Sequence, residues 1–403
     1  RLAAAAATER HMLKLFIFIS KRSVQMLLLF VIFLTVLFFL LEAQPGDLSQ
    51  QYIGNPDIPP EEKARLAARL GLDMPLFSRY LAYMKNFFTG NLGNSLSQYP
   101  TPVTKLIFDA LPRTIVLFLS ATLLAYYLGF VTGKVLAWRR GKMSEYLLTL
   151  GGVGLYTVFY PWFALLMIWT FGFTLSNVTG IRVFPINKFI DVSDWLGSPF
   201  TTNQVFLRMI LVAVLSMLVA AVATVIAKQR LEIRQAIRVR NIAFLLGVVF
   251  PFIYFFFSAM GKYALDILHH TLLPVMTLAL VAFAGIMLLT RSAMLETLRE
   301  DYILTARAKG LPEKVIRDRH AARNALLPVV TSLVLALAFV IGGGIITETV
   351  FSWPGVGLLL YNAVILEDIP LAMGGLSVIA ALALIGHLVA DILYAYLDPR
   401  IRY

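Results

Sequence analysis

Eight apolar runs, each close in length to the roughly 20 residues that a helix needs to cross a bilayer, dominate this sequence. Hydrophobic residues make up 59% of the chain and charged residues only 14%, against about 25% charged residues in soluble domains. This pattern predicts an all-α, polytopic membrane protein. The expected spans are 22–42, 113–137, 145–172, 205–227, 241–258, 271–290, 328–350 and 375–396.

Basic residues mark one side of the membrane. The net charge is +12, and the Lys and Arg residues fall in short clusters between alternate apolar runs. Loops rich in Lys and Arg stay in the cytoplasm, so both termini are expected there. The clusters are Lys14–Arg22, Arg139–Lys142, Lys228–Arg240, 291–327 and Arg400–Arg402. Their position between spans disfavours nucleic-acid binding. The sequence has no cysteine, which excludes disulfides, thiolate metal sites and cysteine catalysis.

The N-terminal region allows two interpretations. Basic residues precede the first run, as in a cleaved signal peptide, but Val24–Leu41 is longer than the apolar core of such a peptide, so we favour a retained helix. The sequence begins with Arg1 rather than Met, and we expect it to start inside a longer chain. In the loop that follows, we expect a short amphipathic helix at 59–71 and a glycine-rich turn at 90–95.

A polar, basic segment between the sixth and seventh runs, Asp301–Pro328, is called the hook. Small residues near the end of its first half allow another backbone to approach closely; they are Ala306, Ala308 and Gly310. Gly310 can reverse the chain and Pro312 can start a second helix over 312–326. We expect two short helices that dock into a groove on a soluble domain. A basic hairpin on the membrane surface would explain the charge but not the small residues.

The hook resembles the cytoplasmic coupling loop, or EAA loop, of ABC-importer permeases of the peptide/nickel type. Further segments resemble the same family and occur in the same order; they are 70–76, 90–95, 111–114, 348–357 and 397–402. Each is weak alone, but five in order together with the hook are specific. The resemblance covers most of the chain except about 176–262.

The resemblance implies the type I permease fold and a subunit that translocates a solute without changing it chemically, so it is not an enzyme. It implies a second, related permease, two cytoplasmic ATPases that hold ATP and magnesium, and an extracytoplasmic solute-binding protein; no cofactor on this chain is implied. In the family the hook lies in a cleft of the ATPase, whose closure moves the membrane helices. The matching residues are Thr305, Ala306, Arg307, Ala308, Lys309, Gly310, Leu311, Pro312, Glu313 and Arg317.

One stretch departs from the family pattern of six spans, because 176–262 inserts two more. An even number of added spans keeps the hook on the same side. The pair could face lipid, bind an extra subunit or regulator, or reflect a miscount in which 241–258 is re-entrant or peripheral. The expected domains are the N-terminal segment and first helix (1–42), an extracytoplasmic loop region (43–112), core helices (113–175), the inserted loop and pair (176–262), and core helices with the coupling loop 291–327 (263–403).

Two patterns suggest ligand sites but fit them poorly. Gly129, Gly133 and Lys134 echo a phosphate loop, yet the spacing is one residue short, Val135 replaces Ser or Thr, and the segment lies within a span. We therefore expect no ATP binding by this chain. His269 and His270 have no partner at ligand spacing beyond Asp266, so a pair at the membrane edge is favoured over a metal site.

Two further clusters remain open between function and structure. Asp391 and His387 share one face of the last span, where ionisable groups serve function or a contact between helices. Near the outer end of the seventh span, a candidate gate or receptor contact competes with a tight turn whose glutamate faces water. Its residues are Glu348, Trp353, Pro354 and Gly355.

From this resemblance we expect a multi-pass permease subunit in the cytoplasmic membrane of a prokaryote, surrounded by lipid. The expected solute is an oligopeptide, with nickel or an oligosaccharide as alternatives within the family. An ion-coupled secondary transporter would need buried acids or an inverted repeat, and a membrane-embedded enzyme would need clustered catalytic side chains. The sequence offers little of either, so both are disfavoured.

Overall fold

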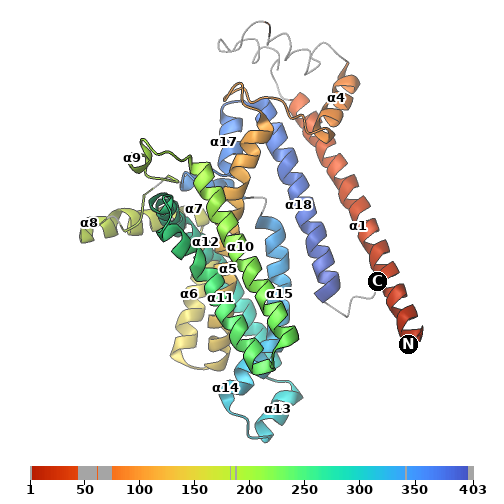
Figure 1. The fold of residues 1–403 in the computed structure, drawn as a ribbon, viewed down its shortest axis with the longest axis vertical. Helices are drawn as coiled ribbons and strands as arrows, with labels where there is room; N and C mark the ends of the chain where they lie inside the picture. The colour runs from red at the N-terminus through yellow and green to blue at the C-terminus, as the bar shows by residue number, and fades with distance from the viewer. Residues whose placement is uncertain are drawn as a thin grey trace. The chain divides into compact units, whose positions relative to one another are not determined.

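The computed structural model describes residues 2–43, 61, 75–181, 183–186, 188–340 and 343–397, and the regular structure within them is helical (Figure 1). The elements are α1 (Leu2–Glu42), α4 (Leu76–Phe88), α5 (Val103–Trp138), α6 (Met143–Thr157), α7 (Tyr160–Met167), the π-helical η1 (Ile168–Thr174), α8 (Leu175–Thr179), α9 (Val192–Trp195), α10 (Thr202–Arg230), α11 (Ile233–Phe256), α12 (Gly261–Thr297), α13 (Asp301–Ala308), α14 (Glu313–Val315), the π-helical η2 (Ile316–Ala321), α15 (Ala322–Phe339), α16 (Ile345–Val350), α17 (Val356–Ile365) and α18 (Ile369–Leu397).

Eight helical segments of the described chain are long and apolar enough to cross a membrane, which confirms the all-α prediction and its number of spans. They are Phe16–Leu40, Val103–Trp138, Tyr160–Thr179, Thr202–Arg230, Ile233–Phe256, Gly261–Thr297, Glu313–Leu337 and Ile369–Leu393. The second begins at Val103 rather than 113, because the helix accommodates Pro112 in its interior. The expected helix at 59–71, apart from Glu61, and residues 398–402 lie outside the described part of the chain.

The third span was expected to be one helix over 145–172, and this was wrong. The structure ends α6 at Thr157 and starts a new helix at Tyr160. The cause is Pro161, which has no N–H to donate to the carbonyl of Thr157 four residues earlier. A proline is tolerated in the first turn of a helix, so the second segment begins there.

The seventh span also differs from the expected 328–350. Helix α15 continues without a break from η2 of the hook, carries Pro328 in its interior, and ends at Phe339. Gly343 then adopts a left-handed backbone with φ of +66°, which separates α15 from the short helix α16. The second half of the hook is therefore the first part of a membrane helix, so the two form one continuous helical segment.

The chain forms two compact units. Unit 1 comprises Arg1–Tyr160, Leu278–Thr349 and Pro354–Tyr403, and unit 2 comprises Pro161–Thr277 and Val350–Trp353. In unit 1, α18 packs against α1, α5, α15 and α17. One of its cores joins α5, α17 and α18; its buried members are Val103, Ile107, Ala363 and Leu371.

Two glycines allow α5 to approach the second half of α12 closely within unit 1. A Cβ atom on Gly129 would lie 2.8 Å from the side chain of Ile286, and one on Gly133 would lie 2.5 Å from the backbone oxygen of Met287. The pair forms a G-x-x-x-G pattern, which brings membrane helices into backbone contact. Helix packing therefore accounts for the two glycines whose spacing resembles that of a phosphate loop.

At one end of unit 1, a buried carboxylate fixes the turn that was expected at 90–95. Gly90 and Gly93 have φ of +75° and +78°, which is the left-handed conformation that such a turn needs. Asp368, just before α18, is fully buried and accepts hydrogen bonds from the backbone N–H groups of Leu96 and Ser97, at 2.9 and 3.0 Å. The hydroxyls of Ser95 and Ser97 also donate to it.

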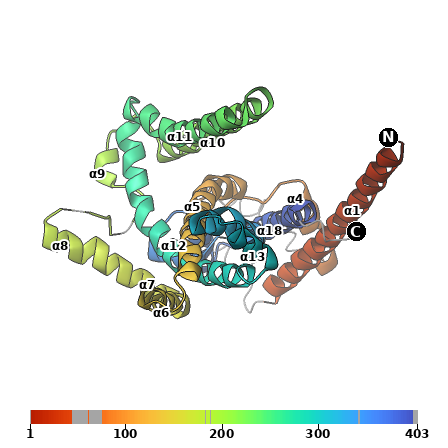
Figure 2. The ribbon, with the colours of Figure 1, turned by 90° about the horizontal axis from the view of Figure 1, so that it is seen from below.

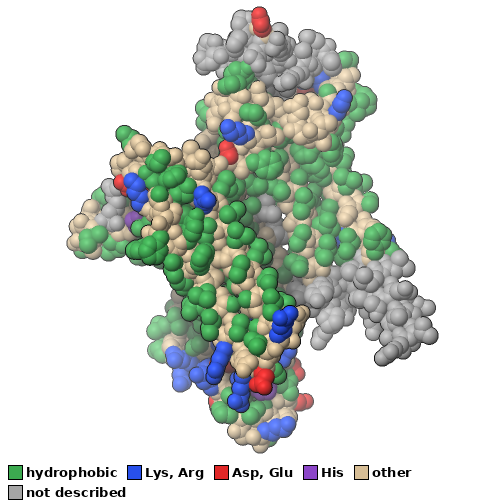
Figure 3. Space-filling view, in the orientation of Figure 1, with side chains coloured by type: hydrophobic (Ala, Val, Ile, Leu, Met, Phe, Trp, Pro, Cys, Tyr) green, Lys and Arg blue, Asp and Glu red, His purple; other side chains and the backbone are tan. Residues whose placement is uncertain are grey.

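In unit 2, α10 and α11 lie side by side as an antiparallel pair (Figure 2). The hydroxyl of Ser216 donates to the backbone oxygen of Gly247 at 2.8 Å, and Gly247 leaves no spare room beside Ala220. The hydroxyl bond and the small residues fix the register of the two helices. Most of the remaining surface of α10 is apolar (Figure 3), as expected of a helix in contact with lipid.

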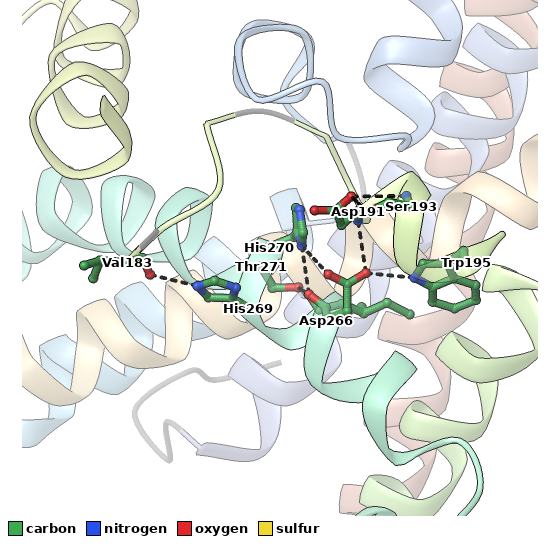
Figure 4. Close-up of polar contacts among 9 residues, drawn as sticks. Val183, Asp191, Ser193, Trp195, Asp266, His269, His270 and Thr271 are labelled. Atoms are coloured by element: carbon green, nitrogen blue, oxygen red, sulfur yellow. Dashed lines mark hydrogen bonds and ion pairs between the residues drawn. The ribbon is translucent and has the colours of Figure 1, made fainter. Parts of the chain in front are cut away.

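Also in unit 2, Asp266 near the start of α12 anchors the segment that precedes α10 (Figure 4). Its carboxylate accepts from the Trp195 indole at 2.8 Å and from the Asp191 backbone N–H at 3.1 Å, and lies 3.1 Å from Nδ1 of His270. His269 bonds instead to the Val183 carbonyl at 2.8 Å, so the two imidazoles have different partners. No cluster of three or more metal-ligating side chains occurs in the described part of the chain.

We predict that Gly133→Ala lowers the thermal stability of the protein. The new methyl group would overlap the Met287 backbone, and overpacking of this kind costs about 1–3 kcal/mol. Thermal unfolding in detergent measures the effect. Gly151→Ala is the matched control, because Gly151 also lies in a helix but has open space around it. Equal melting temperatures for the two variants would contradict close packing of α5 against α12.

Candidate coupling site

The hook is a compact helix–turn–helix. Helix α13 ends at Ala308, and Gly310 reverses the chain with φ of +72°. Its N–H donates to the Arg307 carbonyl at 2.9 Å, and Pro312 immediately precedes α14. The local structure therefore matches the predicted roles of Gly310 and Pro312 in the turn. The expected second helix over 312–326 is built from α14, η2 and the start of α15.

The hook is held against the ends of α5 and α12 by its own apolar core. Ile303 and Ile316 are fully buried, and they pack with small residues from every element of the cluster. These are Ala137 of α5, Ala293 of α12, Ala306 of α13, Ala321 of η2, and Ala322 and Ala325 of α15, together with Met294. Because most partners are alanines, the backbones lie close together where the hook meets the ends of α5 and α12.

The structure divides the ten predicted coupling residues between the surface and the interior. Seven form an exposed face around the turn: Thr305, Arg307, Ala308, Lys309, Gly310, Pro312 and Glu313. Ala306 is buried in the core of the hook, Leu311 is half-buried against it, and Arg317 is half-buried in an ion pair. Arg307 and Glu313 lie 3.6 Å apart across the turn.

Sequence reasoning missed two features of this region. Leu304 is 61% exposed on α13 and adds an apolar group to the surface of the hook. The rest of that surface carries many charged side chains (Figure 3). Asp318 receives two hydrogen bonds from Arg317, both at 2.9 Å, and an ion pair at 3.0 Å from Lys134 of α5. The spacing of apolar residues along α13 could have revealed Leu304, whereas no local signal connects Lys134 with Asp318.

A second ion pair joins the end of α12 to the start of α6. Arg291 donates from Nε to Glu145 at 2.9 Å, with a further bond from the same guanidinium. The other carboxylate oxygen of Glu145 accepts from the Gly141 backbone N–H at 2.7 Å. The turn between α5 and α6 is thereby tied to the helix that leads into the hook.

Glu348, part of the candidate gate or receptor contact, is completely buried within unit 1. Its carboxylate accepts from the Thr114 hydroxyl at 2.8 Å and from the Leu358 backbone N–H at 2.9 Å, and the same hydroxyl accepts from the Val356 N–H at 2.8 Å. Gly355 lies against Thr114 and Glu348 with no space for a Cβ atom. This set is called the Glu348 cluster. The alternative of a water-facing glutamate is wrong, because the cluster encloses it.

The other two members of that candidate site have different surroundings. In unit 2, Trp353 is fully buried, with its ring 4.9 Å from that of Phe189 in an edge-on contact. Pro354 is half-buried in unit 1, and its carbonyl accepts from Arg113 at 3.3 Å. A role for these residues in gating or receptor contact stays a prediction.

Asp391 and His387 in α18 do not act as a pair. Asp391 lies 3.4 Å from Arg22 of α1 in an ion pair between helices. The His387 ring packs edge-on against Phe339 of α15 at 4.9 Å. The arrangement agrees with the structural alternative, in which these polar side chains connect neighbouring helices.

A helical chain with eight candidate spans and a polar hook that leads into the seventh of them is a polytopic membrane protein. The comparison with known families agrees. The chain belongs to the family of binding-protein-dependent transport system inner membrane components, whose model matches residues 238–403. The model for the N-terminal region of such membrane components matches residues 12–118.

Curated relatives match nearly the whole chain. The di/tripeptide transport system permease protein of Pseudomonas aeruginosa is 31% identical over 366 residues, covering 91% of this chain and 93% of the relative. The oligopeptide transport system permease protein of Bacillus subtilis is 30% identical, with coverages of 91% and 93%. The dipeptide transport system permease protein of Escherichia coli K12 is 31% identical, with coverages of 89% and 91%.

These matches confirm the resemblance inferred from the motifs. The protein is a non-catalytic transmembrane subunit of a binding-protein-dependent transport system in the inner membrane of a bacterium. As a component of such a system, it works together with other subunits of the transporter.

We predict that Ile316→Ala loosens the hook. Truncating a fully buried isoleucine costs about 2–5 kcal/mol, and this residue connects η2 with α13. Amide hydrogen exchange over 301–321 should become faster, and trypsin should cut sooner at Arg307 and Lys309. Leu304→Ala serves as the control, since exposed truncations usually change stability by no more than about 0.5 kcal/mol. Similar exchange in both variants would show that the core does not hold the hook.

Proposed function

We propose that this chain is the permease subunit of an ATP-driven ABC importer that translocates short peptides delivered by an extracytoplasmic binding protein. The observation that carries the proposal is the hook, whose core lies on the ends of α5 and α12 and whose turn is exposed. The solute class is supported by the names of the three relatives, which are permeases of dipeptide, di/tripeptide and oligopeptide systems.

The exposed face of the hook acts as the docking surface for an ATPase subunit. Thr305, Ala308 and Gly310 have short side chains or none, so a partner backbone can come close to the turn. Leu304 adds an apolar anchor, and Arg307, Lys309 and Glu313 provide polar contacts around it. ATP and magnesium bind to the ATPase subunits, and this chain contributes motion rather than catalysis.

The remaining partners follow from the same proposal. One hook in this chain engages one ATPase, so a second, related permease provides the hook for the other. The hook faces the cytoplasm because its side of the membrane carries the basic clusters. An even number of spans returns the chain to its starting side, which supports the proposal that both termini lie in the cytoplasm.

Residues 176–262 form an added module within this permease. The family models match 12–118 and 238–403, so α10 falls between the two matches while most of α11 falls inside the second. The expected domain limits (1–42, 43–112, 113–175, 176–262 and 263–403) remain part of this proposal. The α10–α11 pair supports it because the two helices pack mainly against each other.

Replacing Gly310 with tryptophan in the assembled transporter tests the docking role. The bulky side chain projects into open space where the ATPase would lie, and we expect co-purification of the ATPases and stimulated ATP hydrolysis to fall by about tenfold or more. A tenfold loss corresponds to about 1.4 kcal/mol, which a single residue at an interface can contribute.

Gly141→Trp is the matched control for this test. Gly141 has φ of +83°, has open space around it and lies in the turn after α5, so the new residue suffers the same backbone strain outside the exposed face of the hook. Normal hydrolysis in Gly141→Trp and loss in Gly310→Trp would support docking. If Gly310→Trp binds and activates the ATPases like wild type, the hook is not the coupling element.

A further inference from the structure

The strongest unexplained feature is the ion cluster of Lys134, Asp318 and Arg317. Asp318 accepts from Nε and from a terminal nitrogen of Arg317 at 2.9 Å each, and Lys134 Nζ lies 3.0 Å from the same carboxylate. The three side chains are 20–30% exposed, so they are partly shielded from water. Lys134 belongs to α5, whereas Asp318 and Arg317 belong to the hook, so the cluster bridges two parts of unit 1.

The backbone around Asp318 is itself unusual. Arg317 and Asp318 lie in η2, a π-helical segment. Such segments are rare, usually occur as local bulges inside α-helices, and are frequent at functional sites. The apolar core holds the ends of this segment, because Ile316 and Ala321 are both fully buried. The widened turn is therefore a fixed part of the hook, and it carries the carboxylate that faces Lys134.

Lys134 occupies a specific place on α5. It directly follows Gly133, where α5 touches the backbone of α12, so its position beside the hook is set by close helix packing. Twenty residues earlier on the same helix, Thr114 bonds to Glu348 at the centre of the Glu348 cluster. At 1.5 Å per residue that separation is about 30 Å, which equals the thickness of the hydrocarbon core.

We propose that the Lys134–Asp318–Arg317 cluster links the hook to α5, and that α5 passes the movement of the hook to the Glu348 cluster at its other end. Asp318 is the positioning residue. Arg317 orients the carboxylate of Asp318, and Lys134 moves together with that carboxylate. Helix α5 also packs against α15, α17 and α18, so its displacement reaches the helices around it. This inference rests on the proposed function, in which the hook receives motion from an ATPase.

Replacing Lys134 tests the link to α5 without disturbing the fold of the hook. In Lys134→Gln, Asp318 keeps Arg317 as its partner, so no carboxylate is left unpaired and the hook core is untouched. A merely structural pair at this exposure contributes little to stability. A mechanical link, in contrast, is needed in each transport cycle. Loss of a link would therefore lower the uptake per ATP, whereas loss of a merely structural pair would change only the stability of the fold.

The test uses the complete transporter, with its partner permease, ATPases and binding protein, in proteoliposomes. Radiolabelled trialanine is the transport probe, and uptake is divided by ATP hydrolysed. For Lys134→Gln and Asp318→Asn, we expect normal co-purification of the ATPases and an uptake per ATP that falls about two- to fivefold, the range that a half-exposed ion pair supports. The reversed pair, Lys134→Asp with Asp318→Lys, should recover most of the coupling.

A distance measurement provides a readout that does not depend on the peptide. The chain has no cysteine, so spin labels can be placed singly at Arg319 in η2 and at Tyr127 on α5, both of which are exposed. In the wild type, the hook and α5 should move together, and the label distance should stay constant when the ATPases are trapped with ATP and vanadate. In Lys134→Gln, trapping should change that distance.

Arg22→Gln is the matched control, because it removes another ion pair between helices, with side chains that are 42% and 30% exposed. Equal uptake per ATP in Lys134→Gln, Arg22→Gln and wild type would overturn the proposed link. Loss of ATPase co-purification in Lys134→Gln would also overturn it, because the cluster would then only shape the docking surface. Gly310→Trp tests docking separately, so a failure of the link is distinguishable from a failure of the proposed function.

Discussion

The contact of α5 with α12 at Gly129 and Gly133 is the constraint on which the hook depends. It brings the last turns of both helices together, so Ala137 of α5 lies beside Ala293 and Met294 of α12. These residues form the base on which the hook core is built. With larger residues at the two glycines, the base would widen and the hook alanines would lose their partners. The same contact brings Lys134 within reach of Asp318.

Buried carboxylates in unit 1 accept hydrogen bonds from backbone N–H groups that have no partner within a helix. Its chain leaves the helical conformation around 90–101 and at 354–355, so backbone N–H groups there and in the first turn of α17 have no partner within a helix. Lipid cannot bond to such groups, and leaving them unpaired in an apolar environment is costly. Asp368 accepts two of these N–H groups, and Glu348 with Thr114 accepts two more. The irregular segments are thereby fixed to α5 and to the start of α18.

The sequence predicts the spans well because length and hydropathy are local properties. Its errors occur where a proline or glycine acts according to context. Pro161 ends a helix, whereas Pro112 and Pro328 lie inside helices, and nothing in the apolar pattern distinguishes these cases. The turn of the hook was predictable because Gly310 and Pro312 have strong conformational preferences.

Within the hook, the sequence could not show which residues face outward. Ala306 and Ala308 look equivalent in the chain, but only the packing of α13 on η2 places the first inside and the second outside. The partner of Asp318 is Lys134, which lies on a helix far away in the sequence. The glycines before Lys134 favoured a false comparison with a phosphate loop. Contacts between residues far apart in sequence depend on helix packing, which a local pattern does not encode.

The composition of the α10–α11 pair agrees with the proposal that it is an added module of the permease. Its internal contact uses Ser216, Ala220 and Gly247, and large apolar side chains cover most of its remaining surface. Such a pair is stable in lipid because its two helices pack against each other in a fixed register. Two spans also return the chain to the side of the membrane from which it entered. The hook and its attachment to α5 and α12 belong wholly to unit 1. An addition in unit 2 therefore leaves the proposed coupling machinery intact, which supports its interpretation as an accessory module.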